Sequence, residues 1–162
     1  HLGPPLPTMT NSDGTHIQIV QNQEYVVILS EEAIQVRIIR LGKSHPEKLI
    51  PKWMGDSIGH WEDETLVIHT NSFRPEHTVS QIASSEVFEV TERITAISEN
   101  ELLYTYRIVD PETYTAPVVA ELPFHRMVPE HQLYESACHE GNRAVIDILA
   151  GARRIEMDEL NR

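Results

Sequence analysis

Short runs rich in β-branched and other apolar residues recur along most of this chain, and they constrain its fold more than any other feature. The first three such runs are residues 16–21 (HIQIVQ), 25–30 (YVVILS) and 34–41 (IQVRIIRL). β-branched residues favour the extended backbone, so each run predicts a short strand. The pattern predicts a mainly β protein.

Further strands follow, with turn-forming residues between them. Residues 60–70 (HWEDETLVIHT) predict two short strands around a turn at Asp63 and Glu64, after a long loop over residues 43–59. The other expected strands lie within residues 86–98, 102–110, 116–128 and 132–139. Short strands in sequence with turns between them are typical of an antiparallel up-and-down barrel or half-barrel, lipocalin-like in general form.

The two ends of the chain depart from this pattern. Residues 1–15 are rich in proline and small polar residues, so we expect a flexible N-terminal arm. Near the other end, Val145, Ile148 and Ile155 recur at helical spacing, which predicts a C-terminal helix over residues 142–160 that packs against the sheet. Residues 16–162 are therefore expected to form a single domain.

Composition excludes several classes of partner. The chain of 162 residues is long enough for one core, and its 25 acidic against 13 basic residues give a net charge of -12. Such a chain repels polyanions, so no nucleic-acid partner is expected. It has no apolar run long enough for a membrane helix, so no membrane insertion is expected, and a single cysteine, Cys138, excludes an internal disulfide.

Strand alternation predicts which polar side chains point into the barrel. Glu92 shares a face with Phe88, Val90 and Ile94, and in the next strand Tyr104 and Tyr106 fall on the apolar face. In the third strand the same parity carries Arg126 inward. Because a buried carboxylate needs a partner, we expect Glu92 to pair with Arg126 or with a tyrosine hydroxyl.

Two other places carry candidate site residues. His60, Trp61 and Glu62 follow the long loop, where Trp61 is expected either to fill the core or to stack on a flat ligand while His60 or Glu62 exchanges a proton. In the last expected strand the inner face is open to two choices, so that either Tyr134 or Glu135 points inward.

Metal and cofactor sites are not expected. The chain has nine histidines, but none is spaced as in the HxH or HExxH patterns of metal sites. Cys138 and His139 are consecutive in an expected strand and face opposite ways, so a buried structural cysteine is the better interpretation than a nucleophile with its base.

The segment 55–73 (GDSIGHWEDETLVIHTNSF) resembles a motif, G-x-S-x-G-x-W-E-x-D-T-L-V, of a large group of uncharacterised bacterial secreted proteins. PPLPTM near the start, ERIT around Glu92, DPETYTAP and YESACHEGN extend the likeness over nearly the whole chain. The resemblance implies a β-rich fold and a periplasmic or secreted location, but no settled activity. The chain departs from the pattern at Asp63, where Gly is frequent, and at His1 or Leu2, where a Cys is frequent.

Two functions are expected from these residues. The first is an acid/base enzyme, such as an isomerase, lyase or cyclase, that acts on a largely apolar organic compound. Glu92 is then the base, Tyr104 or Tyr106 the proton donor and Arg126 the anion stabiliser. The alternative is a non-catalytic carrier, or an accessory subunit of an extracytoplasmic complex, with a homo-oligomer or a partner protein as a further possibility.

Overall fold

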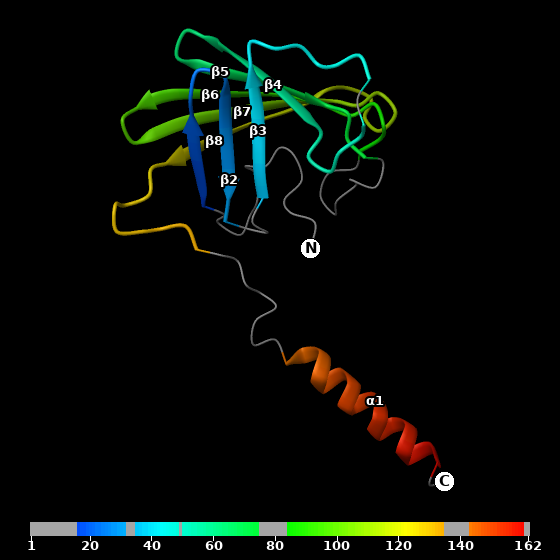
Figure 1. The fold of residues 1–162 in the computed structure, drawn as a ribbon. Helices are drawn as coiled ribbons and strands as arrows, with labels where there is room; N and C mark the ends of the chain where they lie inside the picture. The colour runs from blue at the N-terminus through cyan, green and yellow to red at the C-terminus, as the bar shows by residue number, and fades with distance from the viewer. Residues whose placement is uncertain (1–15, 32–34, 49, 75–83, 135–142, 161–162) are drawn as a thin grey trace.

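The computed structural model describes residues 16–31, 35–48, 50–74, 84–134 and 143–160 of the chain. Their regular structure comprises eight strands and one helix (Figure 1). The elements are β1 (Ile17–Gln21), β2 (Tyr25–Ser30), β3 (Gln35–Leu41), β4 (Asp56–Glu62), β5 (Thr65–Asn71), β6 (Glu89–Ser98), β7 (Glu101–Val109), β8 (Val118–His125) and α1 (Ala144–Leu160).

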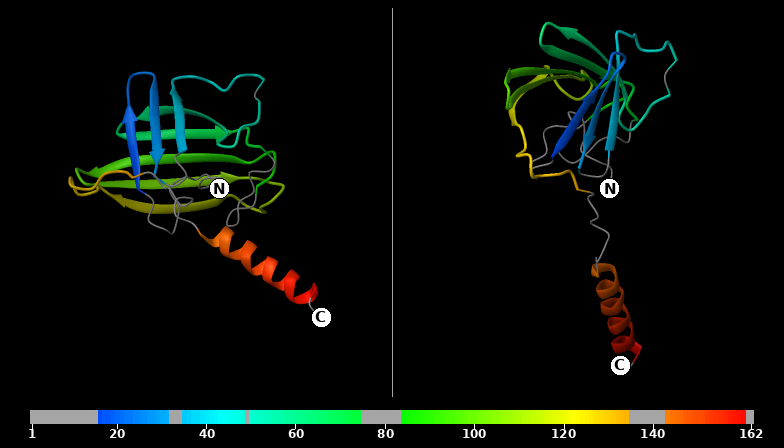
Figure 2. Two further views of the ribbon diagram at one scale, coloured as in Figure 1. Left: turned by 60° about the horizontal axis from the view of Figure 1, so that its bottom comes forward. Right: turned by 60° about the vertical axis from the view of Figure 1, so that its left-hand side comes forward.

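The eight strands form one sheet in the order of the sequence, from β1 at one edge to β8 at the other. The sheet curls into a half-barrel, and Figure 2 shows β1, β2 and β3 standing steeply across β6, β7 and β8. Neighbouring strands are antiparallel except β3 and β4, which pair in parallel through Ile39 and Ser57. The predicted mainly β half-barrel is therefore confirmed, with one parallel pair that the chain's long β3–β4 connection makes possible.

The β4 strand begins earlier than the sequence predicts. The two prolines and two glycines of residues 43–59 predict a loop that extends to Gly59, yet residues 56–59 already belong to β4. Gly59 is required by close packing, because a Cβ there would lie 2.9 Å from Ile39 Cγ2. Gly55 adopts a φ of 64°, which favours glycine at the turn into the strand.

The hairpin between β4 and β5 has the expected turn at Asp63 and Glu64. Thr65 pairs with Glu62, which leaves a two-residue connection, and Asp63 adopts a positive φ of 51°. Short hairpin turns require such left-handed residues because their twist then matches that of the flanking strands.

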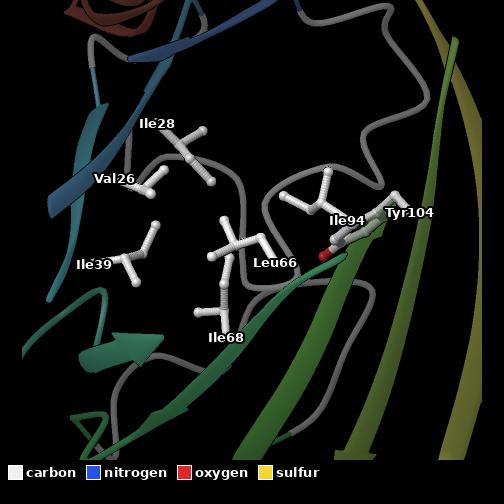
Figure 3. Packing of buried hydrophobic residues seen from close by; sticks show 7 residues of the cluster. All are labelled: Val26, Ile28, Ile39, Leu66, Ile68, Ile94 and Tyr104. Atoms are coloured by element: carbon white, nitrogen blue, oxygen red, sulfur yellow. The ribbon is translucent and has the colours of Figure 1, made fainter. Parts of the chain in front are cut away.

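The core lies between the two halves of the curled sheet. Val26, Ile28 and Ile39 of β2 and β3 face Leu66, Ile68, Ile94 and Tyr104 of β5, β6 and β7 (Figure 3). A second cluster contains Phe73, Phe88, Val90 and Ile108, in which the rings of Phe73 and Phe88 meet edge to face at 5.1 Å. Every core side chain on β6 and β7 belongs to the face that alternation assigned to the interior.

The C-terminal helix forms almost as predicted but does not pack as predicted. No residue of α1 is buried, and Figures 1 and 2 show the helix standing away from the sheet. Helical spacing of apolar residues predicts the helix and its apolar face, but it does not determine which surface that face meets.

The last predicted strand falls mostly outside the described residues. Residues 132–134 form no strand, and residues 135–139 are not described. The N-terminal arm over residues 1–15 also lies outside the described part of the chain.

Candidate functional site

A buried ion pair occupies the interior of the half-barrel. Arg37 on β3 donates from Nη1 to Glu92 Oε1 at 2.9 Å and from Nη2 to Glu92 Oε2, so the guanidinium binds the carboxylate at two points. The side chains of Arg37 and Glu92 are 3% and 1% exposed. The pair joins β3 to β6 across the fold, between strands that are not neighbours in the sheet.

Three hydroxyl groups complete this network. Tyr104 Oη donates to Glu92 Oε1 at 2.7 Å, Arg37 Nε donates to Ser57 Oγ at 3.0 Å, and Arg37 Nη2 donates to Thr70 Oγ1 at 2.6 Å. Ser57 Oγ and Thr70 Oγ1 lie 2.9 Å apart within hydrogen-bond distance. Buried charges are tolerated when they are paired and hydrogen-bonded in this way.

The network determines what Glu92 and Tyr104 can do chemically. Both oxygens of the Glu92 carboxylate already accept hydrogen bonds from Arg37, and the residue is fully buried. Burial and the neighbouring carboxylate raise the pKa of the Tyr104 phenol well above its usual value, so the phenol stays neutral and donates to Glu92. This arrangement favours a rigid link inside the core over a base that meets a substrate.

The predicted pairing of Glu92 with a tyrosine hydroxyl is confirmed, but the predicted pairing with Arg126 is wrong. The β8 strand ends at His125, and Arg126 is exposed just beyond it. Sequence reasoning missed Arg37, although alternation in QVRIIRL places it on the same face as Ile39 and Leu41.

Tyr106 lies beside this network. Its ring packs against the ring of Tyr104 with 5.8 Å between centroids, and burial raises the pKa of its phenol. Tyr106 also packs against both core clusters, so its inward orientation is confirmed.

A cavity of about 600 Å³ opens where the two edge strands β1 and β8 approach one another. Its lining comes from β1, from the turn between β6 and β7, and from the end of β8. The lining residues are His16, Ile17, Gln18, Ile19, Glu99, Asn100, Glu101, Leu102, Phe124, His125, Arg126 and Met127. Arg126 therefore lines this cavity and does not reach the packed interior around Glu92.

Phe124 links the cavity to the buried network. It lines the cavity, and its ring also meets the ring of Tyr104 edge to face at 5.9 Å. The backbone amide of Arg126 donates to the Asn100 carbonyl at 2.8 Å, which fixes the chain at the rim. Glu92 itself is not among the lining residues.

His60, Trp61 and Glu62 are not brought together with Glu92. His60 and Glu62 lie on the opposite face of the sheet, where His60 Nε2 is 3.1 Å from Glu62 Oε1 and Arg93 Nη2 is 2.8 Å from Glu62 Oε2. These contacts lower the pKa of Glu62, the one from Arg93 most strongly. Trp61 is 47% exposed at the end of β4, so it does not fill the core.

The two candidates near residue 134 give no site in the described structure. Tyr134 is 69% exposed, and its backbone amide donates to Glu31 Oε1 at 2.9 Å. Glu135 lies outside the described residues.

Sequence reasoning also missed a polar cluster on the outer face of the sheet. His45 Nδ1 lies 2.8 Å from Asp56 Oδ2, and His45 Nε2 lies 2.9 Å from His69 Nδ1. Burial alone would raise the pKa of Asp56, but the hydrogen bond from His45 and the charges of Arg40 and Lys52 lower it. The three key residues are distant in sequence, so no spacing pattern could have shown them together.

Within the described ranges, no group of three or more His, Cys, Asp or Glu side chains has the geometry to hold a metal ion. None of the helical segments described here has the length and apolar character needed to cross a membrane. Comparison with known protein families, with characterised proteins and with solved structures finds no match.

Proposed function

We propose that this protein binds a small, largely apolar organic compound in the cavity between β1 and β8, and that it acts as a carrier or accessory subunit. The observation that carries the proposal is the cavity of about 600 Å³. Ligand pockets for small organic molecules commonly have volumes of about 300–1,000 Å³. This cavity is large enough for one such molecule.

The lining of the cavity supports a ligand with an apolar body and a polar end. Ile17, Ile19, Leu102, Phe124 and Met127 supply the apolar surface. The rim carries His16, Asn100 and Arg126, together with the acidic Glu99 and Glu101. A guanidinium binds a carboxylate or sulfonate at two points, so Arg126 is the expected anchor for an anionic end group.

A carrier is favoured over an acid/base enzyme because of the state of Glu92. Its carboxylate binds Arg37 and Tyr104, and the residue is fully buried. A general base must reach the proton that it removes, directly or through one water. The enzyme alternative would require the Arg37–Glu92 pair to open before each turnover.

The first test is a calorimetric titration with 1-anilinonaphthalene-8-sulfonate, an aromatic sulfonate with an apolar body and one negative charge. Ile19→Trp places a large ring in the cavity, and we expect it to weaken binding of this probe at least about tenfold, which corresponds to about 1.4 kcal/mol. Val20→Trp is the matched control, because Val20 is the next residue on β1 and is exposed outside the cavity. Equal binding by the wild type and Ile19→Trp would contradict the site.

The anionic anchor is tested in the same way. Arg126→Met is expected to weaken binding of the sulfonate, while Arg107→Met, at an exposed position on β7, leaves it unchanged. Native mass spectrometry of the protein from its source would then identify bound compounds, the number of subunits and any partner proteins by their masses. If a bound compound is converted, and if Glu92→Gln stops conversion without loss of affinity, the enzyme alternative replaces the carrier.

Export from the cytoplasm is part of this proposal, as the resemblance to secreted bacterial proteins implies. Fractionation of source cells with an antibody to the chain tests it. Recovery in the cytoplasmic fraction alone would contradict it.

A further inference from the structure

We propose that His45 and His69 form an acid-sensitive clasp that holds the β3–β4 loop against the outer face of the sheet and releases it when the pair takes up a second proton. The β3–β4 loop is described over residues 42–48 and 50–55. The clasp lies on the outer face of the sheet, and its residues do not line the β1–β8 cavity. It is therefore independent of the proposed ligand.

The clasp is a line of four side chains from four parts of the fold. Asp56 begins β4, His45 belongs to the loop, His69 lies on β5 and Glu89 begins β6. His45 Nδ1 faces Asp56 Oδ2 at 2.8 Å, the two imidazoles share a contact of 2.9 Å, and His69 Nε2 lies 3.6 Å from Glu89 Oε2. The two rings meet edge to face with centroids 5.1 Å apart.

The ring nitrogens of His45 and His69 can hold three protons between them in the clasped arrangement. The Asp56 carboxylate is ionised because its pKa is lowered, so His45 Nδ1 carries a proton and donates it. One proton lies between His45 Nε2 and His69 Nδ1, since a hydrogen bond needs one donor and one acceptor. A third proton on His69 Nε2 faces Glu89. With these three protons the pair carries one positive charge in total, and every proton faces an acceptor.

A second added proton breaks the line. His45 Nε2 and His69 Nδ1 would then both be donors, and neither would keep a lone pair for the other. The surroundings also resist further positive charge. Arg40 and Lys52 both bind Asp56, so with one imidazolium three positive charges already face the carboxylates of Asp56 and Glu89.

The released loop differs from the clasped loop by one proton. Release separates the two rings, so the released state can take up a second added proton that the clasped state cannot hold. The population of the released state is therefore expected to rise as the pH falls, by up to about tenfold for each pH unit. The clasp is intact at neutral pH and is lost as the pH falls.

Two backbone amides report on release. Gly42 N donates to the Gly59 carbonyl at 2.9 Å and Lys52 N donates to the Ser72 carbonyl at 3.0 Å, near the two ends of the loop. We expect the protection of both amides in hydrogen exchange, corrected for the intrinsic pH dependence of exchange, to fall up to about tenfold per pH unit between pH 6.5 and 5. In His69→Gln the same protection should depend much less on pH, because the amide can accept as well as donate, so a proton on His45 Nε2 no longer faces another donor.

His60→Gln is the matched control, because His60 is an exposed histidine on β4 that pairs with Glu62 outside the cluster. It should keep the wild-type pH dependence. Equal pH dependence in the wild type and His69→Gln would overturn the clasp, and so would a flat wild-type profile. A second readout needs no variant: long-range ¹H–¹⁵N spectra of the wild type at pH 7.5 should show coupled His45 Nε2 and His69 Nδ1 resonances sharing one proton, and two independent imidazoles would refute the proposal.

Discussion

Arg37 and Glu92 form a two-point ion pair in the centre of the half-barrel, 55 residues apart in sequence and almost fully buried. The pair connects β3, in one half of the curled sheet, with β6, in the other half. Removing water from two charges is costly. The hydrogen bond that Tyr104 donates to Glu92 and those that Arg37 donates to Ser57 and Thr70 offset that cost. The network therefore fixes how the two halves meet.

Breaking this pair should destabilise the fold strongly. We expect Glu92→Gln to lower the free energy of unfolding by about 3–5 kcal/mol, because it leaves the Arg37 charge buried without a carboxylate. The double variant Arg37→Met/Glu92→Leu should cost much less than the two single changes together. Urea denaturation at pH 7 measures all three. Glu62→Gln is the control, since it breaks an exposed pair with Arg93 and should cost far less than Glu92→Gln.

Tyr104→Phe should remove one hydrogen bond to a buried carboxylate. The expected loss in the free energy of unfolding is about 1.5–3 kcal/mol, measured by urea denaturation. Tyr106→Phe is the control, because Tyr106 is only partly buried, and its cost should be clearly smaller. Similar costs for the two variants would argue against the Tyr104–Glu92 hydrogen bond as a stabilising contact.

The same residue should make stability depend on alkaline pH. The pKa of Tyr104 is raised well above 10.0 in the folded protein by burial and by Glu92. The folded state therefore resists ionisation, so its stability is intact below pH 10 and falls as the pH rises above 10, where the unfolded phenol ionises. Thermal melts between pH 8 and 11 should show this fall in the wild type and a shallower one in Tyr104→Phe. Identical slopes would show that other groups cause it.

Asp110 should stabilise the turn after β7. Its carboxylate accepts hydrogen bonds from the amide and hydroxyl of Ser85, both at 2.7 Å, and from the amides of Glu112 and Thr113 at 3.2 Å. Burial opposes ionisation, but these bonds outweigh it and lower the pKa of Asp110 below 3.8. Asp110→Asn should therefore cost about 1–3 kcal/mol at pH 7.

The contribution of Asp110 to the free energy of unfolding should disappear at acid pH. Because the folded pKa is depressed, the contribution of Asp110 is present above pH 3.8 and is lost as the pH falls through the folded pKa. Denaturation curves of wild type and Asp110→Asn should thus converge below pH 3.8. A difference that stays constant down to pH 2 would contradict a role for the charge.

Asp63→Gly should not destabilise the protein. The substitution tests the backbone conformation of the hairpin turn. Asp63 has a positive φ of 51°, a conformation that glycine adopts without steric cost. We expect a change in the free energy of unfolding between zero and a gain of about 1 kcal/mol, since relief of backbone strain opposes the greater flexibility of the unfolded chain. Asp63→Val should instead lower the melting temperature. The reverse order of the two variants would show that the turn has another conformation.

The sequence alone determined most of the strands and the inner faces of β6 and β7. Alternation with a period of two placed Glu92, Tyr104 and Tyr106 on the inner face, and the structure confirms that placement for all three. It also located the turn at Asp63 and Glu64 and the helix near residues 144–160. These features depend on a few neighbouring residues, so a local pattern is enough to predict them.

Only the tertiary structure decided which side chains meet. The curl of the sheet brings Arg37 rather than Arg126 to Glu92, the parallel return of β4 brings Asp56 beside His45, and β5 brings His69 to the same point. The cavity between β1 and β8 likewise depends on how closely the two edges of the half-barrel approach. Such contacts join residues that are 11 to 55 positions apart. They depend on strand order, register and curvature together, and no short window of sequence specifies these.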